Sequence, residues 1–158
     1  MTSRIAVTTG MPEPLLGEAT EAADLCLDWT SERRNALVSM PEIAHRCRIA
    51  PPPLIRDLFD IAVSVYLSDI AVPRGDNEDW TREFEITIPV RKRDFWEANR
   101  ESLDRILYEL THDRIGLDFC DHSGEIYEFR NDDRSGPDCV CALSGGLDSM
   151  AGATMLLR

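Results

Sequence analysis

Residues 139–157 join a short apolar run, a hexapeptide with two glycines and a second apolar run of helical length. Cys139–Leu143 is apolar and short, which predicts a buried strand. Ser149–Leu157 is rich in Met, Ala and Leu, which predicts a helix. Between them lies Ser144-Gly145-Gly146-Leu147-Asp148-Ser149. A strand that passes through a tight turn into a helix is an arrangement that binds phosphate, because the turn leads directly into a helix N-terminus.

The hexapeptide has the composition of an anion-binding loop. The first backbone N–H groups of a helix have no partner within the helix, and they attract anions. Gly145 and Gly146 allow the backbone to turn tightly and to approach phosphate oxygens closely. Ser144 and Ser149 add hydroxyl donors. The carboxylate of Asp148 has two open roles, orienting the loop or helping to hold Mg²⁺.

Two common phosphate-binding patterns are absent from this segment. It lacks the Gly-Lys-Ser/Thr of a Walker A loop and the Gly-x-Gly-x-x-Gly of a dinucleotide-binding loop. Transfer of a γ-phosphate in the manner of a kinase is therefore disfavoured. A glycine-rich turn without a ligand is the less favoured alternative.

The hexapeptide resembles the loop of the PP-loop ATP pyrophosphatase superfamily, Ser-Gly-Gly-x-Asp-Ser, and residues 144–149 match every defined position. The resemblance implies that ATP is cleaved between its α and β phosphates. AMP is then transferred to a carboxylate or carbonyl oxygen, and a nucleophile such as ammonia displaces it. The implied cofactors are ATP and Mg²⁺, and Ser144, Gly145, Gly146, Leu147, Asp148 and Ser149 would hold the pyrophosphate.

Within this superfamily the string Leu-Ser-Gly-Gly-Leu-Asp-Ser is similar to that of 7-cyano-7-deazaguanine synthases, the QueC group. Asparagine synthetases share the string, so an asparagine-synthetase-like amidotransferase is a less favoured alternative. Those enzymes carry an amino-terminal glutaminase domain with a cysteine nucleophile, and Met1-Thr2-Ser3 does not supply one. Residues 54–66, 84–91 and 95–96 resemble, more loosely, the amino-terminal extension of QueC-like proteins from anti-phage operons, the QatC type. The implied substrate is a small-molecule or protein-linked carboxylate.

The superfamily domain begins at this motif and continues through several more strands and helices. We therefore expect the 158 residues to be the amino-terminal part of a longer enzyme and to be inactive alone. The zinc-binding cysteines typical of the QueC group are not matched, because all five cysteines precede the loop. The predicted organisation is an α+β accessory domain over residues 1–135, followed by the truncated start of an α/β PP-loop (HUP-like) domain over residues 136–158.

Periodicity predicts the elements of the first domain. Alternation predicts strands over residues 4–9, 25–29 and 83–90, and a hairpin over 114–130 with a turn at Asp121–Gly124. Helical spacing predicts helices over 53–71 and 94–111, the second capped by Asp94. The Ile, Val and Tyr content of the first helix suggests deep burial. Met11-Pro-Glu-Pro breaks the first strand, and residues 31–50 are mostly loop.

The net charge and the cysteines bear on which partners and which cellular compartment we expect for this chain. A net charge of −12 disfavours general binding to nucleic acid, because an acidic chain repels phosphate backbones. No stretch approaches the length of a membrane span, and the start lacks a secretory signal. We expect reduced thiols and a cytoplasmic location. Cys139 and Cys141 alternate along one strand, which favours packing over metal binding.

Other candidate residues are weaker. His112, Asp118, Cys120, Asp121 and His122 are close in sequence, but without a second ligand pair we interpret them as surface and turn residues. His45 and Cys47 receive the same interpretation. Arg91-Lys92-Arg93 favours a solvated strand end over a phosphate contact. A non-catalytic module that binds a protein partner through residues 1–135 remains the alternative to the enzyme.

Overall fold

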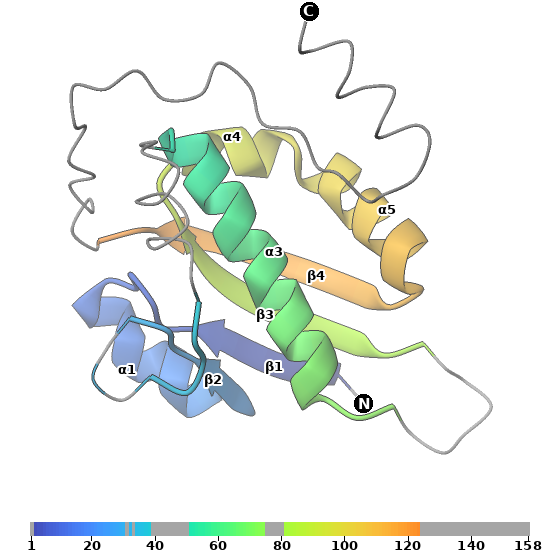
Figure 1. The fold of residues 1–158 in the computed structure, drawn as a ribbon, viewed down its shortest axis with the longest axis horizontal. Coiled ribbons are helices and arrows are strands. Elements are labelled where there is room, and N and C mark those ends of the chain that lie inside the picture. The colour runs from blue at the N-terminus through green and yellow to red at the C-terminus, as the bar shows by residue number, and fades with distance from the viewer. Residues whose placement is uncertain (1, 31, 33, 39–50, 75–80, 124–158) are drawn as a thin grey trace, which may run out of the picture.

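The computed structural model describes residues 2–30, 32, 34–38, 51–74 and 81–123. They form an α+β fold with one four-stranded parallel sheet and four helices, compatible with a Rossmann-like unit (Figure 1). The strand order is β2-β1-β3-β4. In chain order the elements are β1 (Thr2–Val7), α1 (Glu13–Ala22), β2 (Leu25–Leu27), α3 (Pro53–Ala71), β3 (Glu83–Val90), α4 (Arg93–Ala98), α5 (Arg100–Thr111) and β4 (Arg114–Asp121).

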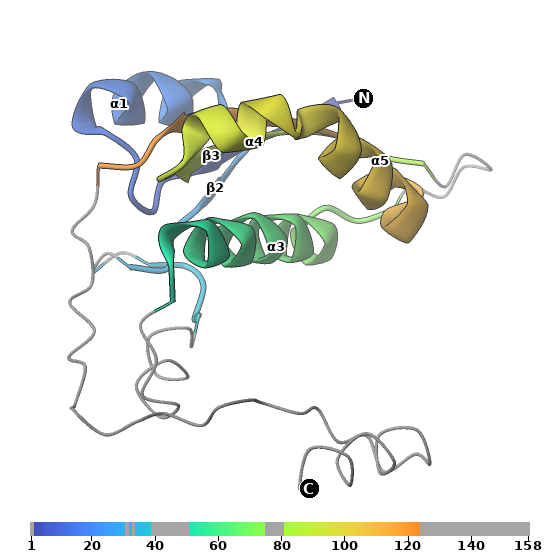
Figure 2. The same cartoon turned by 90° about the horizontal axis from the view of Figure 1, so that it is seen from above.

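One face of the sheet carries the hydrophobic core. Phe84, Ile86 and Ile88 of β3 are buried, whereas Glu83 and Glu85 lie on the other face, because successive side chains of a strand point to opposite sides. The helices α3, α4 and α5 complete this core with Ile61, Val65, Trp96 and Leu107. Figure 2 shows α1 on the opposite side of the strands from α3, and α1 buries none of its residues. The core therefore lies between the apolar face and the later helices.

Most elements predicted from periodicity are confirmed within the described residues. The predictions for 53–71 and 83–90 match α3 and β3 at both ends. The predicted strands over 4–9 and 25–29 correspond to β1 and β2, with shifted or shorter limits. The described part of residues 31–50 contains no helix or strand, as predicted.

Two predictions for residues 94–111 are wrong, and α1 was not predicted. α1 begins between Pro12 and Pro14, which were expected only to end the first strand. Proline is tolerated in a first helical turn, where the missing N–H would have no partner in any case. The helix predicted over 94–111 is two helices separated at Asn99, whose Nδ2 donates to the carbonyl of Phe95 at 2.8 Å. Asp94 is not a cap, because α4 starts one residue earlier and has no side-chain cap bond.

The predicted hairpin is confirmed only in its first strand. β4 pairs with β3 in parallel from Glu83↔Arg114 to Val90↔Asp121. The returning strand, the domain boundary at residue 136 and the loop at 144–149 lie outside the described residues. All pairings within the described sheet are parallel.

An ion-pair network ties the amino ends of β3 and β4 to the end of α3. Asp113 is 1% exposed and accepts hydrogen bonds from the backbone N–H of Arg82 at 2.9 Å and from its Nη2 at 2.6 Å. Arg74 donates to the same carboxylate at 3.1 Å, and Arg82 also pairs with Asp69. Burial alone would raise the pKa of Asp113, but the bonds from Arg82 outweigh it and lower the pKa.

Side chains cap the outer edges of the described sheet. On β2, Asn35 donates from Nδ2 to the carbonyl of Cys26 at 2.7 Å and accepts from the backbone N–H of Asp28 at 2.9 Å. On β4, the guanidinium of Arg100 donates to the carbonyl of Leu117. Both edges thus have some of their backbone groups occupied by side chains from the same chain.

Candidate functional site at the carboxyl edge of the sheet

The carboxyl ends of the four parallel strands meet at one edge of the sheet. The chain runs from β1 to β2 in one direction and from β3 to β4 in the other, so the order β2-β1-β3-β4 reverses between β1 and β3. Open parallel sheets bind ligands in the crevice outside such a reversal. The residues that follow β1, β3 and β4 are therefore the first place to look for a site.

The loop after β1 meets the end of β4 at this edge. Gly10 has a φ of 74°, which favours glycine, and its carbonyl accepts from the backbone N–H of Ser123 at 2.9 Å. The His122 ring lies against Gly10 so closely that a Cβ there would be 2.1 Å from Nε2. The backbone N–H of His122 donates to the carbonyl of Val90 at 3.1 Å. Three strands are thus joined beyond their ends.

A buried carboxylate holds the start of the connection after β3. Asp57 of α3 is 0% exposed and accepts from the backbone N–H groups of Arg91 at 3.0 Å and Lys92 at 2.9 Å. Its side-chain donors are Nε1 of Trp96 at 3.1 Å and Nη1 of Arg91 at 2.9 Å. The carboxylate of Asp57 thus provides hydrogen-bond acceptors for the backbone N–H groups of the two residues that follow β3, which have no partner in the described sheet.

Arg91 links this carboxylate to His122. Its Nη1 also donates to Asp60 at 2.8 Å, and its Nη2 lies 3.0 Å from Nε2 of His122. A guanidinium has no acceptor, so Nε2 must accept the hydrogen bond and the imidazole is neutral, with its proton on Nδ1. Burial, followed by the charge of Arg91, lowers the pKa of His122 to about 4. In this cluster the guanidinium of Arg91, held by Asp57 and Asp60, therefore lies beside the neutral imidazole of His122.

The low pKa of His122 predicts acid sensitivity between pH 6.5 and pH 4. A base whose folded pKa is depressed favours the unfolded, protonated chain, so stability is present above the unfolded value and is lost as pH falls toward the folded one. The shift from 6.5 to about 4, discounted because the ring keeps contact with solvent, corresponds to about 1–2 kcal/mol.

The measurement is denaturant unfolding at pH 7.0 and pH 4.5 of the unsubstituted chain and of His122→Gln, whose carbonyl oxygen can still accept from Arg91. The unsubstituted chain should lose about 1–2 kcal/mol more than the variant, because the carboxylates common to both cancel. His112→Asn is the control, since His112 is exposed and adopts a left-handed φ of 59° that asparagine tolerates. Equal losses in all three proteins contradict the prediction.

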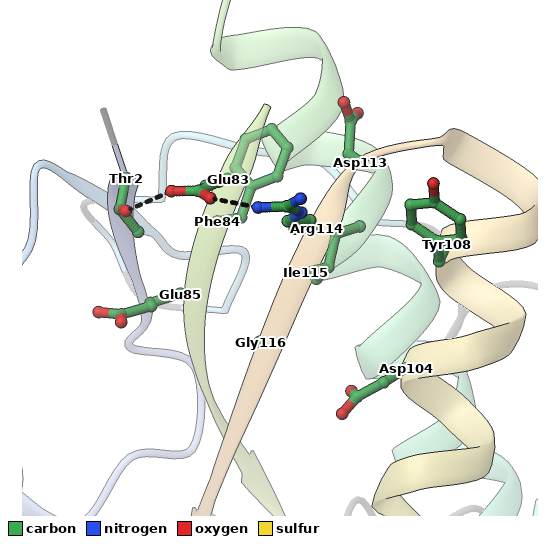
Figure 3. Close-up of a pocket in the computed structure, with 10 residues that line it drawn as sticks. All are labelled: Thr2, Glu83, Phe84, Glu85, Asp104, Tyr108, Asp113, Arg114, Ile115 and Gly116. Carbon is green, nitrogen blue, oxygen red and sulfur yellow. Dashed lines mark hydrogen bonds and ion pairs between the residues drawn. The ribbon is translucent and has the colours of Figure 1, made fainter. Parts of the chain in front are cut away.

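A pocket of about 410 Å³ lies at the opposite, amino edge (Figure 3). Glu83 lies between Thr2 and Arg114, with a hydrogen bond of 3.0 Å from the hydroxyl and an ion pair of 3.2 Å to the guanidinium. Asp104 points from α5 toward β4, and its buried Oδ1 has no hydrogen-bond partner among the described residues. Burial raises the pKa of Asp104. Open parallel sheets bind ligands at their carboxyl edge, so we place the candidate site at the carboxyl edge and not in this pocket.

The histidines, cysteines and aspartates considered above as possible metal ligands do not form a metal site in the described part of the chain. Among the described residues no group of three or more His, Cys, Asp and Glu could hold a metal ion. Cys120 is 8% exposed, and burial raises the pKa of its thiol to about 11, so the thiolate that a metal needs is disfavoured. The interpretation of Cys120 and His122 as surface residues is wrong, because one is buried and the other is packed against Gly10. His45 and Cys47 lie outside the described residues.

Sequence reasoning missed the Asp57–Arg91–His122 cluster. Arg91 was expected at a solvated strand end, but its side chain is only 19% exposed and contacts two carboxylates. One signal was present: Asp57 shares the helix face of Ile61, Ser64 and Val65, and a charge on a buried face requires partners. The partners lie more than 30 residues away along the chain, which no periodicity reveals.

The predicted loop residues Ser144 to Ser149 lie outside the described residues, so their geometry does not enter the site above. No family model, curated protein or solved structure matches this chain. No helix in the described ranges is long and apolar enough to cross a membrane.

Proposed function

We propose that this chain is part of a PP-loop ATP-dependent carbon–nitrogen ligase, similar to 7-cyano-7-deazaguanine synthase. One observation carries the proposal: residues 144–149 match Ser-Gly-Gly-x-Asp-Ser at every defined position, between an apolar run and a helix-forming run. ATP would activate a small-molecule or protein-linked carboxylate as its adenylate, with release of pyrophosphate. Ammonia would then displace AMP. A place in anti-phage defence belongs to the same proposal.

The residues of the loop suit the two charged products of ATP cleavage. Backbone N–H groups at Gly145 and Gly146, with the hydroxyls of Ser144 and Ser149, would bind pyrophosphate oxygens. Carboxylate, hydroxyl and phosphate oxygens are the hard donors that Mg²⁺ prefers, so Asp148 fits a role beside a metal-bound pyrophosphate. Bound Mg²⁺ would neutralise part of the charge on the leaving group.

The described sheet supports the proposal only indirectly. The chain leaves β4 at the carboxyl edge, and this edge is where parallel sheets gather their ligands. The sequence that follows therefore starts from the same side of the sheet as Arg91 and His122. We propose that this edge faces the ATP-binding loop, with residues 1–135 acting as the accessory domain.

Calorimetric titration of the full chain with ATP and Mg²⁺ tests this function. We expect binding that inorganic pyrophosphate competes away. The double variant Ser144→Ala/Asp148→Asn should weaken binding at least about 100-fold, because two charge-assisted contacts at about 1.5–3 kcal/mol each are lost. Ser135→Ala/Asp133→Asn makes the same chemical changes outside the loop and should bind as the parent does.

The outcomes separate the two candidate functions. Equal binding by the loop variant and the parent would show that the hexapeptide is not the ATP site. A folded parent, verified by circular dichroism, that binds no ATP favours the alternative function, in which residues 1–135 recognise a protein partner without catalysis.

A further inference from the structure

The outward side of α3 carries an apolar stripe along its whole length. Ile55 is 50% exposed, Leu58 47%, Tyr66 64% and Ile70 62%. With Ala62 between them, these residues recur at spacings of three and four, so they share one side of the helix. We call these five residues the α3 stripe. The opposite side of α3 is buried against β3, where Ile61 and Val65 join the core beside the buried polar residues Asp57, Ser64 and Ser68.

A surface helix ordinarily turns polar residues outward, so apolar residues along the outward side of a helix are typical of a helix that is covered there as well. The sequence predicted deep burial for α3, but the described residues bury only the side that faces the sheet. Large contiguous apolar surfaces on soluble domains mark sites that another element covers. The α3 stripe therefore needs an occupant from beyond the described residues.

The chain after β4 starts close to the beginning of this stripe. Ser123 is bonded to Gly10, and His122 contacts Arg91, which is held by Asp57 in the second turn of α3. The 19 residues of α3 extend about 28 Å. About nine residues of extended chain cover that distance. The segment beyond Ser123 thus reaches any point on the stripe before residue 147.

Residues 149–157 have the composition to cover it. Met150, Met155, Leu156 and Leu157 spread over most of the circumference of the predicted helix. Such a helix has one apolar side for its own domain and another for α3. Residues 39–50 are a poorer match, because Glu42, Arg46 and Arg48 interrupt their apolar positions.

We propose that residues 149–157 dock as a helix on the α3 stripe of the same chain. Tethering favours this occupant over a second copy, because a short linker gives an effective concentration in the millimolar range. The docked helix would seat the segment that carries Ser144–Ser149 directly on the sheet domain. The proposal does not require the loop to bind ATP, so it stands or falls separately from the function above.

Photo-cross-linking of the full chain without nucleotide tests the docking. A benzophenone amino acid replaces Tyr66 in the stripe, and in a matched control it replaces Tyr108, an exposed tyrosine of α5. Mass spectrometry of the monomer band should find the Tyr66 probe joined to a residue within 149–157, and the Tyr108 probe not joined to it. A cross-link to residues 39–50, a cross-linked dimer, or no cross-link from the Tyr66 probe would overturn the proposal.

Hydrogen exchange gives a second, independent readout. The double variant Leu58→Glu/Tyr66→Glu places charge on the stripe, and these side chains are exposed, so α3 and the sheet should keep their protection. Amides within 150–157 should exchange at least about tenfold faster than in the parent. Leu110→Glu, at a residue of α5 that is 76% exposed, should leave them unchanged. Unchanged exchange at 150–157 in the double variant contradicts the docking.

Discussion

Replacement of Asp57 by alanine should lower the free energy of unfolding by about 3–5 kcal/mol, the effect of removing one partner from a buried ion pair. The carboxylate is fully buried and accepts from two backbone N–H groups, a guanidinium and an indole. Alanine would leave the two backbone N–H groups and the indole without this acceptor, and of its two carboxylate contacts Arg91 would keep only that with Asp60. Chemical denaturation at pH 7 measures the loss.

Asp104→Ala is the matched control for Asp57→Ala. Asp104 is also a helical aspartate, but its buried Oδ1 has no partner among the described residues, and burial raises its pKa. Its removal should therefore be neutral or stabilise by up to about 1 kcal/mol. If the two substitutions destabilise the protein equally, the bonds to Asp57 do not carry the energy assigned to them. If Asp57→Ala has no effect, the carboxyl edge is not organised by this residue.

Gly10→Ala is expected to lower the free energy of unfolding by about 2–5 kcal/mol. About 1–2 kcal/mol comes from a non-glycine residue at a φ of 74°. A further contribution of about 1–3 kcal/mol comes from overpacking, because the new Cβ would lie 2.1 Å from Nε2 of His122. The ring must move away, and its contact with Arg91 is then broken.

Gly17→Ala makes the same change where nothing lies within 4 Å of the added Cβ, inside α1. Alanine is the better helix former, so this variant should gain about 0.5–1 kcal/mol. The two variants have the same amino-acid composition, and thermal unfolding should show a loss of stability for Gly10→Ala and a gain for Gly17→Ala. A destabilisation of less than about 1 kcal/mol by Gly10→Ala would mean that His122 is not fixed against this turn.

The parts of the fold that could be predicted are those whose physics is local. β3 alternates apolar and polar residues, and α3 follows a proline with apolar residues at helical spacing, so both were placed correctly. α1 was missed because Pro12 and Pro14 ordinarily signal a stop, although the first turn of a helix accepts proline. The division at Asn99 was missed because the apolar spacing continues across it.

The candidate site divides in the same way. A loop such as residues 144–149 can be found from sequence, because its chemistry depends on consecutive residues. The cluster at the carboxyl edge could not, because Asp57, Arg91 and His122 belong to three elements that only the strand order brings together. Likewise, the sequence predicted deep burial for α3 but not an exposed stripe, since periodicity locates apolar residues and does not show which side of a helix is covered.

The side chains that occupy the outer strands also bear on how this protein behaves at high concentration. Fibrils and many amorphous precipitates grow when an outermost strand recruits a strand from a neighbouring molecule. Here a recruit must first displace Asn35 from Cys26 on one side or Arg100 from Leu117 on the other. Concentrated samples should therefore resist the addition of strands from other molecules at β2 and β4. Substitution of Asn35 or Arg100 should weaken this protection.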